Sequence, residues 1–183
     1  NREAGRAAAR HLVEAGCKRL AFFGEVNDHG FGIDPAYMDR FEGFAGEALR
    51  CGLTLYGEAV FDVSRGDGLT LPVLERAADF IVANGIDGVF DLTDDGVLQV
   101  RERLAARGTP VQFQTVGVKT VMRKKPAVQN QACVTFDGFE MGVKSIQALR
   151  TLLVGDETPG LLKTVEPGFI HGTAGIQPGA PTN

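Results

Sequence analysis

The pair Asp94-Asp95 is the arrangement in this sequence best suited to acid–base chemistry. Two neighbouring carboxylates can share the roles of general acid and general base, or they can hold Mg²⁺. The same pair follows an expected strand and precedes an expected helix, where aspartates cap free N–H groups and complement the helix dipole. We favour the capping interpretation over catalysis.

Arg40 is the second candidate, near the start of an expected helix that Asp34-Pro35 opens after a glycine-rich loop. Its planar fork of N–H donors suits a ligand hydroxyl, carbonyl or carboxylate. The alternative is an ion pair on the helix surface with Asp39 or Glu47. Both interpretations of Arg40 stay open, while Asp34 is suited to cap the helix.

The signatures of common enzyme classes are missing. The sequence has no G-x-S-x-G elbow, no G-x-x-x-x-G-K-[ST] phosphate loop, no H-E-x-x-H and no C-x-x-C. Its 3 histidines lack the spacing of metal ligands, and its 3 widely separated cysteines are an odd number, which argues against a disulfide framework. We therefore expect no enzyme, no cofactor and no metal site, and cysteines that are small buried or half-buried thiols.

Strands that alternate with helices must position these side chains. Apolar runs predict strands at 19–23, 55–61, 89–92, 111–118 and 132–136, with a last extended segment at 161–170. Helical spacing and stop signals predict helices at 1–15, 35–51, 72–83, 96–107 and 138–153. Apolar and polar residues alternate in 111–118, which predicts an outer strand with one wet face.

The alternation predicts an α/β fold with a mostly parallel, doubly wound sheet flanked by helices. Ligands of such sheets bind beyond the carboxyl ends of the strands. We therefore expect four segments along one edge of the sheet, at 27–40, 61–64, 93–95 and 117–120.

The bulk composition is that of an ordinary globular protein. The chain has 183 residues, 44% of them hydrophobic, and a net charge of -4, which suits one domain and does not indicate a nucleic-acid surface. No apolar run is long enough to cross a bilayer. The chain starts Asn-Arg-Glu, which suggests a piece of a longer protein. Free thiols are typical of a reducing compartment, so we expect a cytoplasmic protein.

Several short motifs, taken in order, resemble the LacI/GalR family of bacterial transcriptional regulators. Residues 1–24 show its pattern of Asn, Gly, Ala, His-Leu, Gly, a basic pair and an apolar strand. Residues 40–44 resemble its R-x-x-G-F/Y motif, and residues 87–95 resemble its strand with a Thr-Asp turn. Residues 115–117 are similar to its V-V-G strand, and residues 135–142 to the stretch before its returning helix. The set covers nearly the whole chain.

The resemblance implies part of an effector-binding domain of the type I periplasmic-binding-protein kind, which has two lobes. Residues 1–183 resemble the second lobe with the elements that return from the first, whereas the first lobe and the helix-turn-helix DNA-binding domain are absent from the sequence. The implied protein is a homodimer that binds a sugar, a nucleobase or a similar small molecule. It would reach DNA only through a domain outside this chain, and it would have no membrane partner.

The resemblance also implies ligand-binding residues. Arg40 would contact the ligand, Asp34 matches a ligand-side position, and Asp94 falls where the family has a ligand-contacting Asn or Thr. Val63 falls where the family often stacks an aromatic ring on the ligand. Lys119 stands where the family usually has an aspartate, so this cation favours an acidic or phosphorylated ligand, unless it simply points to solvent.

Three other readings share the expected fold. They are a sugar-binding protein of a transport system, a sensor lobe fused to a kinase or cyclase output domain, and a small α/β enzyme, which the missing catalytic motifs disfavour. All versions of a ligand-binding lobe require a parallel core with Arg40 and Asp94 on the same edge of the sheet.

Overall fold

The computed structural model describes residues 1–24, 35–53, 55, 60–62, 70–92, 96–109, 111–121, 132–154 and 166–170. Every structural statement below concerns these residues.

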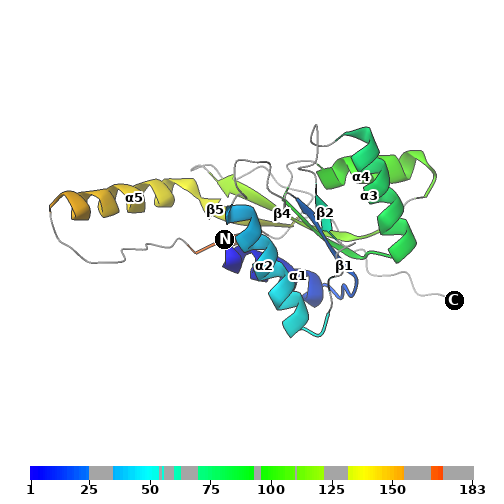
Figure 1. The fold of residues 1–183 in the computed structure, drawn as a ribbon, viewed down its shortest axis with the longest axis horizontal. Coiled ribbons are helices and arrows are strands. Elements are labelled where there is room, and N and C mark those ends of the chain that lie inside the picture. Colours follow the sequence, from blue (N-terminus) through cyan, green and yellow to red (C-terminus); the bar gives the residue numbers. More distant parts are fainter. Residues whose placement is uncertain are drawn as a thin grey trace.

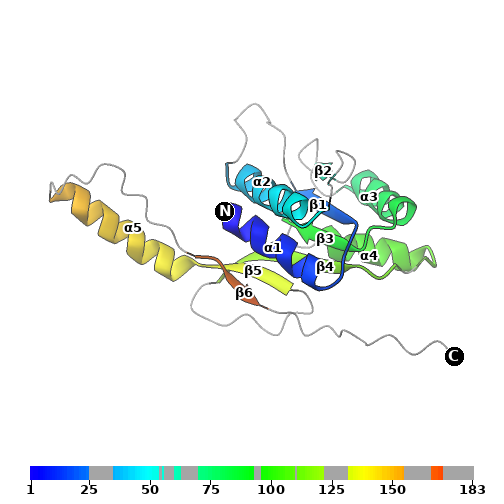
Figure 2. The same ribbon diagram turned by 90° about the horizontal axis from the view of Figure 1, so that it is seen from below.

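Among the described residues, one sheet of six strands forms the centre of the molecule, in the order β2-β1-β3-β4-β5-β6. The strands are β1 (Leu20–Gly24), β2 (Val60–Asp62), β3 (Gly88–Asp91), β4 (Gln114–Val121), β5 (Ala132–Asp137) and β6 (Gly168–Ile170). All neighbouring pairs from β2 to β5 are parallel, and β6 runs antiparallel to β5 at one edge. The order 2-1-3-4-5 is that of a doubly wound sheet, so the predicted fold class is confirmed (Figure 2).

Four helices cover the two faces of this sheet, and a fifth extends beyond it. They are α1 (Arg2–Glu14), α2 (Pro35–Arg50), α3 (Leu71–Asn84), α4 (Gly96–Ala106) and α5 (Gly138–Leu153). Helices α1 and α2 lie on one face, and α3 and α4 lie on the other (Figure 1). The predicted helix stops are confirmed by glycines of positive φ after α1 to α4, at Gly16, Gly52, Gly85 and Gly108.

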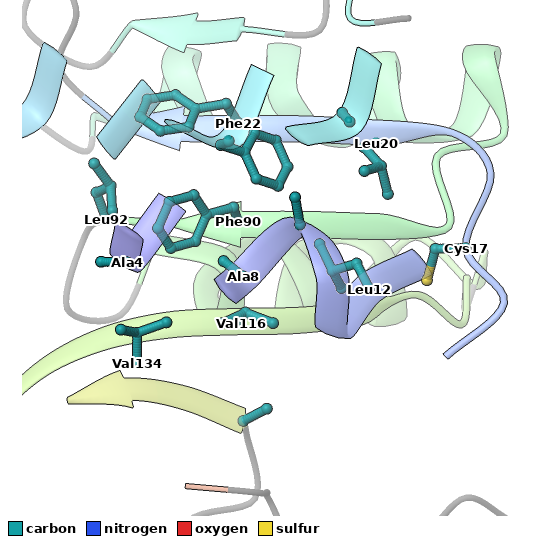
Figure 3. Packing of buried hydrophobic residues seen from close by; sticks show 14 of the residues in the cluster. Ala4, Ala8, Leu12, Cys17, Leu20, Phe22, Phe90, Leu92, Val116 and Val134 are labelled. Carbon is teal, nitrogen blue, oxygen red and sulfur yellow. The ribbon is translucent and has the colours of Figure 1, made fainter. Parts of the chain in front are cut away.

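The two faces of the sheet have separate cores because side chains alternate along each strand. Phe22 of β1 and Phe90 of β3 point to the α1–α2 face, with ring centroids 5.8 Å apart (Figure 3). Phe23 and Val89, their neighbours in sequence, point to the α3–α4 face. Each fully buried phenylalanine stabilises the fold by roughly 1.5–3 kcal/mol.

Two predictions about strands were wrong in part. Strand β4 lies between β3 and β5 rather than at the outside of the sheet, and Thr115, Val116 and Gly117 are all buried. Part of the alternation that suggested an outer strand lies in residues 111–113, which precede β4. The second strand begins at Val60 in the described part of the chain, and Leu55 lies outside it.

Some large apolar side chains of the helices are exposed. Leu49 of α2 is 68% exposed and Leu98 of α4 is 46% exposed. Helix α5 has an apolar stripe at helical spacing, yet none of its residues is buried. This helix projects from the body of the molecule in both ribbon views (Figures 1 and 2).

Candidate functional site

The carboxyl ends of the central strands meet at one edge of the sheet. Phe23 of β1 is in register with Asp91 of β3, and Asp91 is in register with Gly117 of β4. The segments 25–34 and 93–95, which follow β1 and β3, lie outside the described residues. Strands β1 and β3 flank the switch point, where open sheets of this kind hold their ligands.

Arg40 lies at this carboxyl edge, as predicted. Its guanidinium carbon is 5.4 Å from the ring centroid of Phe136, the second-last residue of β5, and 5.7 Å from that of Tyr37. Its Nε donates a hydrogen bond to Asn1 Oδ1 at 3.1 Å. Both rings are close enough for cation–π attraction. The structure therefore puts Arg40 between the start of α1 and the end of β5.

The surface ion pairs considered for Arg40 involve other arginines. Asp39 Oδ1 is 3.1 Å from Arg2 Nε. Glu47 Oε1 is 2.6 Å from Arg50 Nη2 and 3.7 Å from Arg10 Nη1. Arg40 instead contacts Asn1 and two aromatic rings, an arrangement that no spacing within the helix suggested.

The other predicted ligand-binding residues are Asp34, Val63, Asp94 and Lys119. Asp34, Val63 and Asp94 lie outside the described residues, so their roles stay predictions. The backbone of Lys119 lies in β4 opposite Thr135, one position before the pair Thr120–Phe136. Its backbone therefore lies close to the strand position that contacts Arg40, and its ligand role also stays a prediction.

Asp91 is a residue that sequence reasoning missed. It ends β3 and is 2% exposed, and its Oδ2 accepts a hydrogen bond from the backbone N–H of Val97 at 3.2 Å. A carboxylate at this place caps the start of α4 and suits the positive end of the helix dipole. The cap thus comes from the strand end and links β3 to the start of α4. The sequence signal was an aspartate at the end of an apolar strand.

A charged groove lies between α1 and α2, with a volume of about 450 Å³. Its lining consists of Glu3, Arg6, Arg10, Glu42, Gly43, Gly46, Glu47 and Arg50. A hydrogen bond from Arg50 holds the pKa of the buried Glu47 carboxyl below its ordinary value. A hydrogen bond from Arg10 likewise lowers the pKa of Glu3. The arginines of the groove each have a glutamate partner, and the pair of Arg10 Nη1 and Glu47 Oε1, 3.7 Å apart, joins the two helices.

The cysteines match their prediction as free thiols. Cys17 and Cys133 are buried and Cys51 is half-buried. Burial raises the pKa of the Cys17 thiol to about 11, with a smaller contribution from Asp87. Among the described residues, no cluster of three or more His, Cys, Asp or Glu side chains could hold a metal ion. In that same part of the chain, no helix combines the length and apolar character needed to span a membrane.

Sequence comparisons find no matching protein-family model and no matching curated protein. Solved structures are similar in fold. The transcriptional regulator CelR in complex with cellobiose has a TM-score of 0.70 and 20% identity, over 94% of this chain and 51% of CelR. The Escherichia coli transcriptional repressor ascG has a TM-score of 0.68 and 18% identity, over 94% of this chain and 61% of the repressor.

A sugar-binding transcriptional regulator of the LacI family from Escherichia coli, complexed with phosphate, has a TM-score of 0.67 and 18% identity. The match covers 93% of this chain and 59% of that regulator. The chain thus spans between about half and about three-fifths of the length of these regulators. At such low identity the similarity concerns the fold, and the resemblance seen in the sequence motifs agrees with it. The chain therefore has the fold of LacI-family transcriptional regulators over part of their length.

Proposed function

We propose that this chain is the second lobe of the effector-binding domain of a LacI-type transcriptional regulator. The observation that carries the proposal is the position of Arg40, a cation at the carboxyl edge of a parallel sheet next to the end of β5. Small-molecule sites of open α/β sheets form at this edge. On this proposal the protein is a regulator and not an enzyme.

The exposed face of α5 supports a two-lobed domain. Its apolar stripe is Phe139, Val143, Ile146, Leu149 and Leu153, and the large side chains of Ile146 and Leu153 are 70% and 78% exposed. The opposite face carries the ion pair of Glu140 and Lys144, whose atoms are 2.8 Å apart. An amphipathic helix of this kind is stable when its apolar face packs against another surface. We assign that surface to the first lobe.

The ligand class follows from the cations near the edge. Arg40 suits hydroxyl, carbonyl or carboxylate oxygens of a sugar or related molecule. Lys119, where the resemblance leads us to expect an aspartate, favours a sugar acid or phosphorylated sugar. Two of the structurally similar regulators are in complex with cellobiose and with phosphate, which is in keeping with a ligand of this kind.

The remaining parts of the proposal concern assembly. The regulator is a homodimer that works in the cytoplasm and binds DNA through a domain outside these 183 residues. The effector alters DNA binding by favouring one arrangement of the two lobes, as linkage between two sites requires.

Isothermal titration of the full-length protein tests the ligand assignment. We expect sugar acids or sugar phosphates to bind more tightly than neutral sugars of the same size. Arg40→Gln should weaken binding by roughly 10- to 100-fold, because it removes charge-assisted hydrogen bonds of about 1.5–3 kcal/mol. The control Arg50→Gln, which removes an arginine of the salt-bridge network on the same helix, should bind as the wild type does.

Two results would overturn parts of this proposal. Tight binding of neutral sugars alone would reject the role of Lys119. A full-length protein that binds sugars but shows no sequence-specific DNA binding in a gel-shift assay would reject the regulator, and would point to a transport or sensor protein of the same fold.

A further inference from the structure

We infer that Arg40 ties the start of α1 to the end of β5, so that these two segments move as one body. The inference rests on the proposed function in one respect: in a two-lobed domain these segments are the connections through which the chain enters the second lobe and leaves it. The tie itself is a property of the described residues.

The start of α1 is attached to α2 mainly near Arg40. Arg40 Nε donates to Asn1 Oδ1 at 3.1 Å, and Arg2 pairs with Asp39 at 3.1 Å. The backbone oxygen of Arg40 also lies so close to Gly5 that a Cβ on Gly5 would be 2.0 Å from it. The first turn of α1 therefore cannot move independently of the segment of α2 that carries Arg40.

The end of β5 is held by the same side chain. The ring of Phe136 lies 5.4 Å from the guanidinium carbon, within the range of a cation–π contact. The next residue, Asp137, caps α5: its Oδ1 accepts hydrogen bonds from the N–H groups of Phe139 and Glu140 at 2.9 Å. The side chain of Arg40 thus contacts β5 one residue before Asp137, the N-cap of the projecting helix.

The returning strand lies next to this point. Gly168 of β6 pairs with Thr135 of β5, the residue before Phe136. On the two-lobed proposal, the chain enters this lobe near Asn1, leaves it after Phe136 and returns at Gly168, and Arg40 contacts the first two of these places. A ligand that binds the Arg40 guanidinium would act on both connections at once. The arrangement of the two lobes would then depend directly on whether ligand is bound.

Hydrogen exchange of the full-length protein without ligand tests the tie. Two sets of amides report on it: the N–H of Gly5, which donates to the Asn1 carbonyl oxygen at 3.2 Å, and the N–H groups of Phe139 and Glu140. In Arg40→Gln both sets should exchange roughly five- to tenfold faster, because the cation–π contact with Phe136 is lost together with the hydrogen bond to Asn1.

Two further variants distinguish the specific contacts of Arg40 from a general loss of stability. Arg40→Lys keeps a cation for the rings but lacks the Nε donor, so it should restore protection at Phe139 and Glu140 but not at Gly5. The control Arg50→Gln, on the same helix but paired with Glu47, should leave both sets unchanged. Unchanged exchange at either set in Arg40→Gln would overturn the inference, as would equal acceleration of both sets in Arg50→Gln.

The failure of the proposed function would look different. A full-length protein with no first lobe or no ligand would contradict that function, while the exchange pattern would still decide whether Arg40 joins the two segments. If the exchange results are as expected and the first lobe is present, one spin label is attached to each lobe. The distribution of distances between the two labels should be broader in Arg40→Gln than in the wild type. An unchanged distribution would overturn the claim that the tie controls the connections.

Discussion

Gly43 of α2 lies directly against the backbone oxygen of Arg2 in α1: a Cβ on Gly43 would be 2.0 Å from that oxygen. Gly5 of α1 has the same relationship with the backbone oxygen of Arg40. The two helices therefore cross at a pair of glycines. The motifs N-x-x-x-G and R-x-x-G, which stood out separately in the sequence, are the two halves of this single crossing.

Gly43→Ala should destabilise the protein because the added methyl group must push the two backbones apart. Overpacking of this kind costs about 1–3 kcal/mol, which exceeds the roughly 1 kcal/mol that alanine gains over glycine within a helix. The matched control is Gly46→Ala in the same helix, where the added Cβ would meet nothing within 4 Å. Urea unfolding should show a lower midpoint for Gly43→Ala and an unchanged or higher midpoint for Gly46→Ala; equal midpoints would contradict the crossing.

Asp87, the residue before β3, links β3 to β1 and β4 through hydrogen bonds at the amino edge of the sheet. Its Oδ1 accepts from the N–H groups of Lys18 and Arg19 at 2.9 and 2.8 Å, and its backbone oxygen accepts from Gln114 at 2.9 Å. Asp87→Ala should lower the free energy of unfolding by about 1–3 kcal/mol, because two backbone donors lose a charged acceptor. Asp87→Asn, which keeps one oxygen acceptor, should lose less. The control is Asp79→Ala, which removes an exposed carboxylate and should change the free energy of unfolding by about 1 kcal/mol or less.

The lowered pKa of Glu47 makes the free energy of unfolding depend on pH. Because the Arg50 hydrogen bond lowers its folded pKa below the ordinary 4.5, this carboxylate stabilises the fold above pH 4.5, and the contribution is lost as pH falls through the folded pKa. Glu47→Gln should therefore lose less stability between neutral and acidic pH than the wild type does. Arg50→Gln removes the cause of the shift and should show the same shallower dependence. The free energy of unfolding is measured by chemical denaturation at each pH. The same pH dependence in the wild type and in both variants would refute this assignment.

Most elements of the fold were predictable because they follow from local patterns. The stops at Gly52 and Gly85 and the helix start at Pro35 were read from neighbouring residues, and the structure has them there. The place of β4 in the sheet was not predictable in this way. Its pairing with β5 is a contact between distant segments, and the alternation near Gln114 says nothing about it.

The candidate site was predictable only in part for the same reason. The place of Arg40 at the carboxyl edge follows from the βα order of the chain. Its contacts with Asn1 and Phe136 join residues far apart in sequence, and neither partner suggested itself as belonging to the site. Asp91 was missed because the neighbouring pair Asp94-Asp95 offered a more obvious cap.

The apolar stripe of α5 can be recognised in the sequence, but its exposure cannot. Sequence periodicity shows that a helix has an apolar face, and it does not show what covers that face. Leu149 is 56% exposed in this chain. On the two-lobed account it is covered by the first lobe of the same protein.

Cysteine labelling of α5 in the full-length protein tests the central claim, that this chain is one lobe of a two-lobed domain. Leu149→Cys places a thiol on the apolar stripe, and Gln147→Cys places one on the opposite face, while both positions are exposed in this chain. The account predicts slow alkylation of Leu149→Cys and fast alkylation of Gln147→Cys, read by mass spectrometry with native Cys51 as the internal reference. Equal and fast alkylation of both variants would contradict it.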